Sequence, residues 1–106
     1  MPSLKYSVNG KLIAQPQKGQ ELLGYLLEAA QEIENLPECY CYIVGMNPAE
    51  PDAVYVYEVW ESEAAHDASL QLPVFANLIQ KARPIIAGME DFPSLTIFGG
   101  KAKHLG

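Results

Sequence analysis

A carboxylate, an indole and an imidazole lie close together in the sequence, at Glu58, Trp60 and His66. The run 53–60 predicts a β-strand. Because side chains alternate along a strand, Glu58 and Trp60 share a face that is otherwise lined by valine. A charged group on so apolar a face is costly to bury unless it has a partner. His66 lies one helical turn beyond the end of the strand. We therefore expect this junction to be the place where chemistry occurs.

These three residues could act together on an aromatic guest. Trp60 could pack on the ring of the guest and donate its indole N–H, and His66 could move a proton near neutral pH. Glu58 could orient His66 or balance its charge. Each residue also has a structural alternative: Trp60 as core packing, His66 as a surface histidine, and Glu58 as one half of a structural ion pair.

Three further residues are candidates for contact with the guest. Arg83 could steady an anionic oxygen, although it could equally satisfy the carbonyl groups at the end of its helix. Tyr42 is one of several strand tyrosines that are expected mainly in the sheet or an interface, and one of these could reach the pocket. Phe75 is expected to face inward from a helix.

The elements that must position these residues follow from the periodicity of the chain. Strands are predicted at 4–14, 39–46, 53–60 and 95–98, and helices at 20–36, 63–70 and 73–82, with Ser62 as an N-cap and Gly88 closing the last helical segment. The order strand, helix, strand, strand, helix, strand predicts an α+β, ferredoxin-like βαββαβ sandwich with a four-stranded antiparallel sheet. We expect one domain over 1–106, with its core at about 4–98 and a loose tail over 99–106.

Helices on one face of such a sheet leave the other face open. The strands at 39–46 and 53–60 carry apolar or aromatic side chains on both faces, so an isolated sheet would expose a large apolar patch. We therefore expect a homodimer that forms through the open sheet face.

Composition excludes several classes of function. The chain has 106 residues and a formal net charge of −6, which disfavours nucleic acid as a partner. No stretch is long and apolar enough to span a membrane, and we expect a cytoplasmic protein. Cys39 and Cys41 are two apart on a predicted strand and should share a face, too far apart for an ordinary disulfide. They are too few to form a metal site, and none is predicted.

Three segments together resemble the antibiotic biosynthesis monooxygenase family of small dimeric ferredoxin-like proteins. They are Leu36-Pro-Glu-Cys-Tyr-Cys-Tyr42, Val56-Tyr-Glu-Val-Trp-Glu-Ser62 and the segment from Ala64 to Pro73, which contains His66. The resemblance covers about residues 4–98, and its most specific element is the Glu-x-Trp at the end of a strand. It is greatest for the branch described as quinol monooxygenases.

The resemblance implies oxidation of a small phenol, hydroquinone or polyketide-like aromatic by dioxygen, without flavin, haem or metal, in a pocket between the sheet and the helices. It implies that Trp60 lines this pocket and that His66 stands near the substrate. Ser69 stands where many relatives carry a histidine, so haem binding is not implied. Two alternatives remain: isomerisation or epimerisation of a small carbonyl compound, and a non-catalytic module for binding small aromatics or for stress response.

Overall fold

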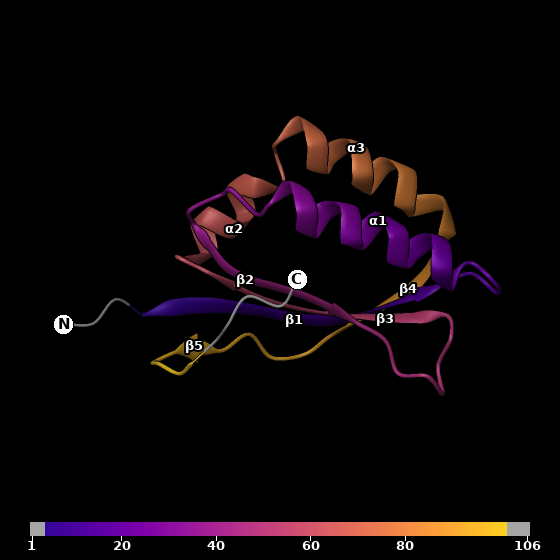
Figure 1. Ribbon diagram of the computed structural model, residues 1–106, viewed down its shortest axis with the longest axis horizontal. Coiled ribbons are helices and arrows are strands. Elements are labelled where there is room, and N and C mark those ends of the chain that lie inside the picture. The colour runs from indigo at the N-terminus through magenta and orange to yellow at the C-terminus, as the bar shows by residue number, and fades with distance from the viewer. Residues whose placement is uncertain (1–3, 102–106) are drawn as a thin grey trace.

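The computed structural model describes residues 4–101 and has the helices and strands labelled in Figure 1. The strands are β1 (Lys5–Ala14), β2 (Cys39–Gly45), β3 (Ala53–Trp60), β4 (Ile86–Asp91) and the short β5 (Thr96–Ile97). The helices are α1 (Gly19–Glu32), α2 (Glu63–Ser69) and α3 (Pro73–Ala82), and the 3-10 turn η1 (Arg83–Ile85) joins α3 to β4. The protein thus has the ferredoxin-like α+β fold that the sequence predicts.

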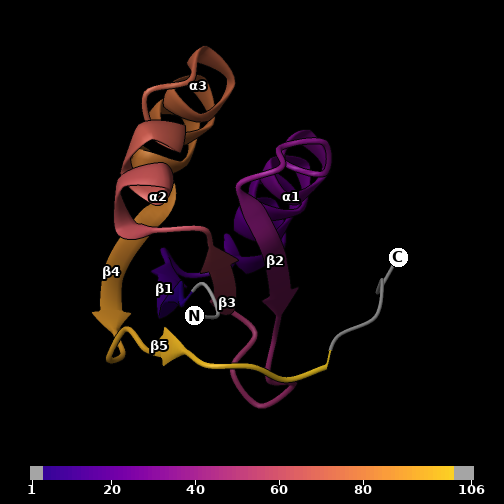
Figure 2. The same cartoon turned by 90° about the vertical axis from the view of Figure 1, so that its left-hand side faces the viewer.

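The sheet is antiparallel, with the strands in the order β2-β3-β1-β4. β5 pairs with the first residues of β1, beyond the part of that strand that pairs with β4. The helices cover one face, with α1 above β2 and β3 and with α2 and α3 above β1 and β4 (Figure 2). Side chains on the covered face of β3 therefore point into the layer between the sheet and the helices.

Two apolar clusters fill this layer, one toward each end of β3. One contains Trp60 together with Phe75 of α3, and the other contains Val54 together with Leu22 of α1. Trp60, Val54 and Leu22 are completely buried. Burial of each large apolar side chain contributes about 1.5–3 kcal/mol to folding. The covered face of β3 also carries Glu58, so this acid lies between two apolar clusters.

The prediction of the last strand was wrong. The fourth full strand is Ile86–Asp91, with Gly88 inside it, whereas the predicted strand at 95–98 contributes only the two residues of β5. Ile86–Asp91 is a strand because it pairs along Gly10–Ala14 of β1. This long-range pairing outweighs the poor strand propensity of its glycine and acids. α1 is also shorter than predicted and ends at Glu32.

A β-bulge in β2 corrects the prediction for the two cysteines. Cys39 lies opposite Trp60 and Cys41 lies opposite Val59, and these two neighbours on β3 face opposite sides of the sheet. The cysteines therefore lie on opposite faces of the sheet, because the bulge inserts a residue between them. Both thiols are free. Cys39 packs against the Trp60 cluster, and burial raises the pKa of its thiol to about 11.

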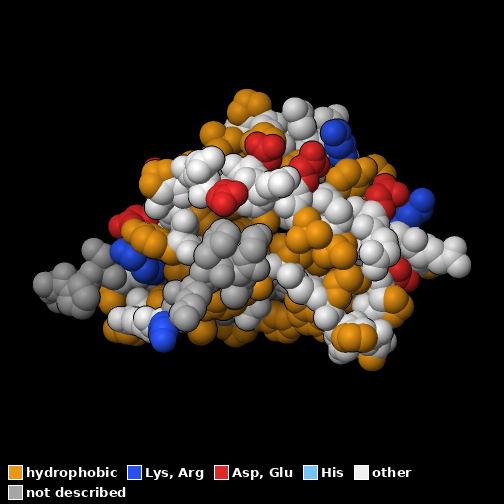
Figure 3. All heavy atoms as spheres, viewed as in Figure 1, with side chains coloured by type: hydrophobic (Ala, Val, Ile, Leu, Met, Phe, Trp, Pro, Cys, Tyr) orange, Lys and Arg blue, Asp and Glu red, His pale blue; other side chains and the backbone are white. Residues whose placement is uncertain are grey.

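The face of the sheet turned away from the helices is partly apolar. Ile43 is exposed there, and Tyr57 and Val59 are half-buried. The chain after β5 continues along this side of the sheet (Figure 2), where Phe98 is 77% exposed. Figure 3 shows apolar side chains gathered along the corresponding lower margin of the molecule.

Some of the predicted features fall outside the described residues. Of the tail expected over 99–106, residues 102–106 lie outside the described part of the chain, as do residues 1–3. Within residues 4–101, every helix is too short or too polar to cross a lipid bilayer.

Candidate functional site

The end of β3 holds a carboxylate and an indole side by side, as strand parity predicts. The indole Nε1 of Trp60 donates a hydrogen bond of 2.8 Å to Oε1 of Glu58. Trp60 has no exposed surface and Glu58 is 9% exposed. The buried acid thus has the hydrogen-bond partner that its burial requires. The indole N–H, which was predicted to donate a hydrogen bond to an aromatic guest, donates to Glu58 instead.

The turn from β3 into α2 is fixed by Ser62. Its backbone is extended, and its hydroxyl accepts a hydrogen bond of 3.1 Å from the backbone N–H of Ala65. This is the N-cap that the sequence predicts, and such caps contribute about 1 kcal/mol to helix stability. Because the helix starts immediately after the strand, its first turns lie next to the end of β3 and carry His66 to the site.

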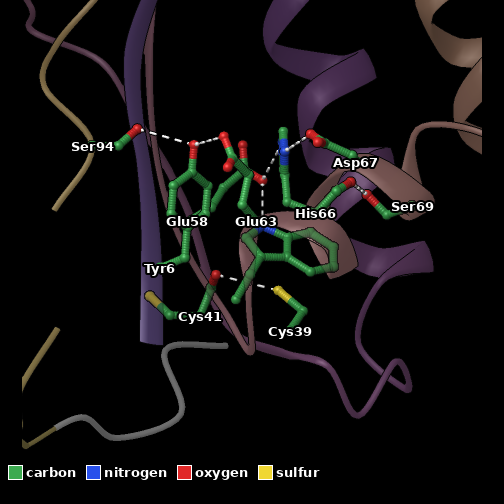
Figure 4. Close-up of polar contacts among 10 residues, drawn as sticks. Tyr6, Cys39, Cys41, Glu58, Glu63, His66, Asp67, Ser69 and Ser94 are labelled. Carbon is green, nitrogen blue, oxygen red and sulfur yellow. Dashed lines mark hydrogen bonds and ion pairs between the residues drawn. The ribbon is translucent and has the colours of Figure 1, made fainter. Parts of the chain in front are cut away.

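The imidazole of His66 lies between two carboxylates and against the indole (Figure 4). The ring centroids of His66 and Trp60 are 5.6 Å apart, and the rings meet edge to face at 74°. The Nε2 atom of His66 is 4.0 Å from Oε1 of Glu58, and its Nδ1 atom is 3.2 Å from Oδ1 of Asp67. Both ring nitrogens therefore face an acid, and the side chain of His66 is only 18% exposed.

Burial determines the proton affinity of Glu58. Loss of hydration raises the pKa of its carboxyl group, and the hydrogen bond from Trp60 and the charge of His66 offset this rise only in part. Its Oε1 atom makes the contacts with both residues, whereas Oε2 takes part in neither. The side chain keeps 12% of its surface exposed. The site thus presents a carboxylate that is more basic than an ordinary glutamate and is still within reach of a small molecule.

Tyr6 belongs to the same group, although the sequence analysis did not name it as a site residue. It lies directly opposite Trp60 in the pairing of β1 with β3, and its ring centroid is 6.4 Å from that of His66. Its hydroxyl donates to Glu63 at 3.5 Å and accepts from Ser94 at 3.3 Å (Figure 4). The alternation of residues 4–8 was the available signal, but only the strand order brings Tyr6 to the site.

Of the three other predicted residues, two join the site and one does not. Tyr42 lies opposite Glu58 on β2, and both Tyr42 and Phe75 pack in the Trp60 cluster. Burial, with a smaller effect of the charge on Glu58, raises the pKa of Tyr42 above its usual range. Arg83 is exposed in η1, next to the Val54 cluster at the other end of the helical layer. Its expected role beside an anionic oxygen has no support in this geometry.

Comparison with known proteins agrees with this fold and identifies the family. The profile of the family "Antibiotic biosynthesis monooxygenase" matches residues 5–81, which include the whole Glu58–Trp60–His66 group. The chain belongs to the antibiotic biosynthesis monooxygenase family.

Solved structures extend the comparison over nearly the whole chain. A Chloroflexus aurantiacus protein named "putative Antibiotic biosynthesis monooxygenase" is 35% identical, with a TM-score of 0.83 over 92% of this chain and 97% of that one. A Bacteroides thetaiotaomicron protein with the same name has a TM-score of 0.83 at 18% identity, over 94% and 96% of the two chains. The second likeness shows the fold alone.

One sequence relative is longer than this chain. The "Uncharacterized protein sll1783" of Synechocystis is 25% identical over 80 residues, which are 76% of this chain and 54% of that protein. The chain thus spans about half the length of that relative.

A hollow in the described part of this family member lies away from the indole. Its volume is about 220 Å³, and it is lined by Lys11, Ile13 and residues 50–53, near the start of β3. The indole itself is completely enclosed. Without rearrangement, a guest at the Trp60 end meets partly exposed side chains, among them Glu58, His66 and Tyr6, and not the indole. Within residues 4–101, no three His, Cys, Asp or Glu side chains are grouped as metal ligands.

Proposed function

We propose that this protein is a cofactor-independent monooxygenase that oxidises a small phenol or hydroquinone with dioxygen. The observation that carries the proposal is the nearly buried carboxylate of Glu58, held between the indole N–H of Trp60 and the imidazole of His66. Membership of the antibiotic biosynthesis monooxygenase family supports the class of reaction. The monooxygenase name of the Chloroflexus aurantiacus protein supports it as well.

The protein has to make the substrate a better reductant. A phenol reacts with dioxygen far more readily as a phenolate, so the first step is removal of its hydroxyl proton. Glu58 is the base, and its raised pKa makes it a better acceptor of that proton than an exposed glutamate. His66, with Nε2 4.0 Å from Oε1 of Glu58, stabilises the carboxylate and takes part in returning the proton.

The overall reaction balances without another reductant. A phenol and dioxygen give a quinone and water, and a hydroquinone and dioxygen give a hydroxyquinone and water. In both cases one oxygen atom enters the ring and the other leaves as water, and the substrate supplies all four electrons. The chain supplies positioning and a base.

Oxygen uptake tests this proposal. The protein is incubated in air-saturated buffer with a panel of phenols and hydroquinones in an oxygen electrode, and labelled dioxygen traces one atom to the ring. Glu58→Gln should lower kcat/KM about 100-fold or more, which is the usual contribution of a positioned base. Glu61→Gln is the matched control, because Glu61 is exposed beside the same strand end.

Other outcomes favour the alternatives. Turnover of a hydroxyketone at the same rate without oxygen would replace oxygenation by isomerisation, for which Glu58 and His66 could also act as acid and base. Tight binding of an aromatic compound without turnover would leave only a binding module. Either result would contradict the monooxygenase proposal.

We also propose that a second copy of the chain covers the open face of the sheet. That face carries the exposed Ile43 and the half-buried Tyr57 and Val59, and the segment after β5 adds Phe98. Light scattering should give twice the monomer mass of 11.7 kDa. Val59→Lys should shift the mass toward the monomer, and a monomeric wild-type protein at micromolar concentration would contradict the proposal.

A further inference from the structure

We propose that Tyr6 is the residue against which the aromatic guest stacks, and that Trp60 acts behind it as a positioning residue for Glu58. This inference rests on the proposed function and names the contact residue for its substrate. It changes the role of the indole, which the family resemblance implies to be part of the pocket lining.

Accessibility distinguishes the two aromatic side chains. Trp60 has no exposed surface, whereas Tyr6, its direct neighbour across β1 and β3, is only partly buried. A planar guest that arrives from solvent therefore meets the tyrosine ring and the edge of the imidazole first. The ring centroids of Tyr6 and His66 are 6.4 Å apart, within the range in which aromatic rings interact.

The contacts of the Tyr6 hydroxyl are the ones that a guest could displace most easily. They are 3.5 Å to Glu63 and 3.3 Å from Ser94, longer than the 2.7–2.8 Å that is usual between oxygen atoms. Both partners are exposed. By contrast, the adjoining Leu95 is held to Ser7 by hydrogen bonds of 2.6 and 2.9 Å. A guest that displaces the Tyr6 hydroxyl from these contacts therefore breaks weaker hydrogen bonds than one that moves the segment around Ser94.

The geometry at Glu58 gives the guest its orientation. Oε1 is occupied by the indole N–H, which leaves Oε2 to accept the hydroxyl group of the guest. A phenol that lies on the Tyr6 ring can turn its hydroxyl toward this oxygen, because Tyr6 and Glu58 point to the same side of the sheet (Figure 4). The hydrogen bond from Trp60 fixes the carboxylate in that position.

Anaerobic binding of hydroquinone tests the inference, because turnover is then impossible. Affinity is measured by calorimetry, and KM with oxygen uptake is measured in parallel. Tyr6→Ala should weaken binding and raise KM about tenfold or more, whereas Tyr6→Phe keeps the ring and should stay within about threefold. Trp60→Phe keeps the Tyr6 ring, so it should weaken hydroquinone binding less than Tyr6→Ala does, and it should shift the pH profile of kcat/KM because Glu58 loses its donor. Tyr40→Ala is the control, since Tyr40 is an exposed tyrosine whose hydroxyl donates to Glu61 and not to Glu58.

Each outcome separates the contact role from a structural one. Wild-type affinity in Tyr6→Ala, or an equal loss in Tyr6→Ala and Trp60→Phe, would overturn the inference. Circular dichroism checks that the variants fold, and Tyr6→Leu, which keeps apolar volume, replaces Tyr6→Ala if that variant does not.

The same measurements distinguish a failure of the contact role of Tyr6 from a failure of the proposed monooxygenase function. Hydroquinone binding that depends on Tyr6, without oxygen uptake, would overturn the monooxygenase proposal and support the contact role of Tyr6. Oxygen uptake with a KM that is insensitive to Tyr6→Ala would overturn the contact role alone. A wild-type protein that neither binds hydroquinone nor consumes oxygen in its presence would overturn both.

Discussion

Glu58, near the end of β3, and Glu50, in the loop just before its start, have pKa values displaced in opposite directions. Glu50 accepts hydrogen bonds of 2.5 Å from Lys11 and 2.7 Å from Tyr55, and these contacts lower its pKa. Glu58 accepts a hydrogen bond of 2.8 Å from Trp60 and has His66 nearby, yet its pKa is raised. Each acid thus has an aromatic donor and a basic side chain.

The difference lies in access to water. Glu50 keeps 35% of its side-chain surface exposed, against 12% for Glu58. An exposed carboxylate keeps its hydration while it gains partners, so its charged form is favoured. A buried carboxylate loses hydration that its partners do not fully replace. The end of β3 at Trp60, with the greater burial, is therefore where an unusual base is found, even though the end at Glu50 has the shorter contacts.

The largest expected effect comes from removing the aromatic partner of each acid. Trp60→Ala should destabilise the protein by about 3–5 kcal/mol, because it leaves a cavity and an unpaired buried carboxylate. Tyr55→Ala should cost about 1 kcal/mol, because its partner Glu50 can turn to solvent. Chemical denaturation measures both values. Equal losses would show that the two ends do not differ in packing.

A second pair of substitutions tests how tightly the loop at Glu50 is held. A Cβ atom on Gly19 would lie 2.0 Å from the carbonyl oxygen of Pro51, so Gly19→Ala should cost about 1–3 kcal/mol or more. Gly24 in the same helix has nothing within 4 Å of that position, and Gly24→Ala should add about 0.5–1 kcal/mol. Thermal melts compare the two variants. A Gly19→Ala variant as stable as the wild type would contradict the close approach.

The side-chain hydrogen bonds to the first turns of α1 and α2 should have similar energies but different consequences. Ser62 caps α2, and Asp52 accepts from the backbone N–H of Gly19 at the start of α1. Ser62→Ala and Asp52→Ala should each cost about 1 kcal/mol. Only Ser62→Ala should alter the nuclear magnetic resonance chemical shifts of the His66 ring, because α2 carries that residue. A change in the His66 signals in both variants would mean that the starts of α1 and α2 are structurally coupled.

The smallest effect expected is on the pH dependence of stability. The pKa of Glu58 in the folded protein lies above its usual 4.5. Its contribution to the free energy of unfolding is therefore complete below pH 4.5 and is lost as the pH rises through the folded-state pKa. Glu58→Gln should remove this decline. The folded pKa of Glu50 is lowered, so its contribution is present above 4.5 and is lost on acidification, and Glu50→Gln should remove that loss. Urea midpoints measured between about pH 3 and 8 give the pH dependence of stability for the wild type and both variants. If both substitutions removed a change of the same sign, Glu58 and Glu50 would not differ in the direction of their pKa shifts.

Local rules predicted the parts of the site that are adjacent in sequence. Alternation placed Glu58 and Trp60 on one face, and the capping serine placed α2 directly after β3. Both predictions depend on periodicity within one segment. The bounds of β3 and α3 also follow from local patterns.

Long-range pairing decided what the sequence could not predict. Ile86–Asp91 has weak strand propensity and is a strand only because β1 offers it an edge. Tyr6 reaches the site through the same kind of pairing, on the other side of β1. Arg83 was placed near the guest because helical periodicity does not show at which end of the layer a helix terminates.

The bulge in β2 affects how readily another molecule can add a strand to this edge of the sheet. β2 is an edge of the sheet, and a flat edge strand offers free backbone groups on which another molecule could add a strand. The bulge between Cys39 and Cys41 breaks the regular spacing of those groups, and Tyr40, which it turns outward, bonds to Glu61. Addition of a strand from another molecule is therefore disfavoured at this edge of the sheet.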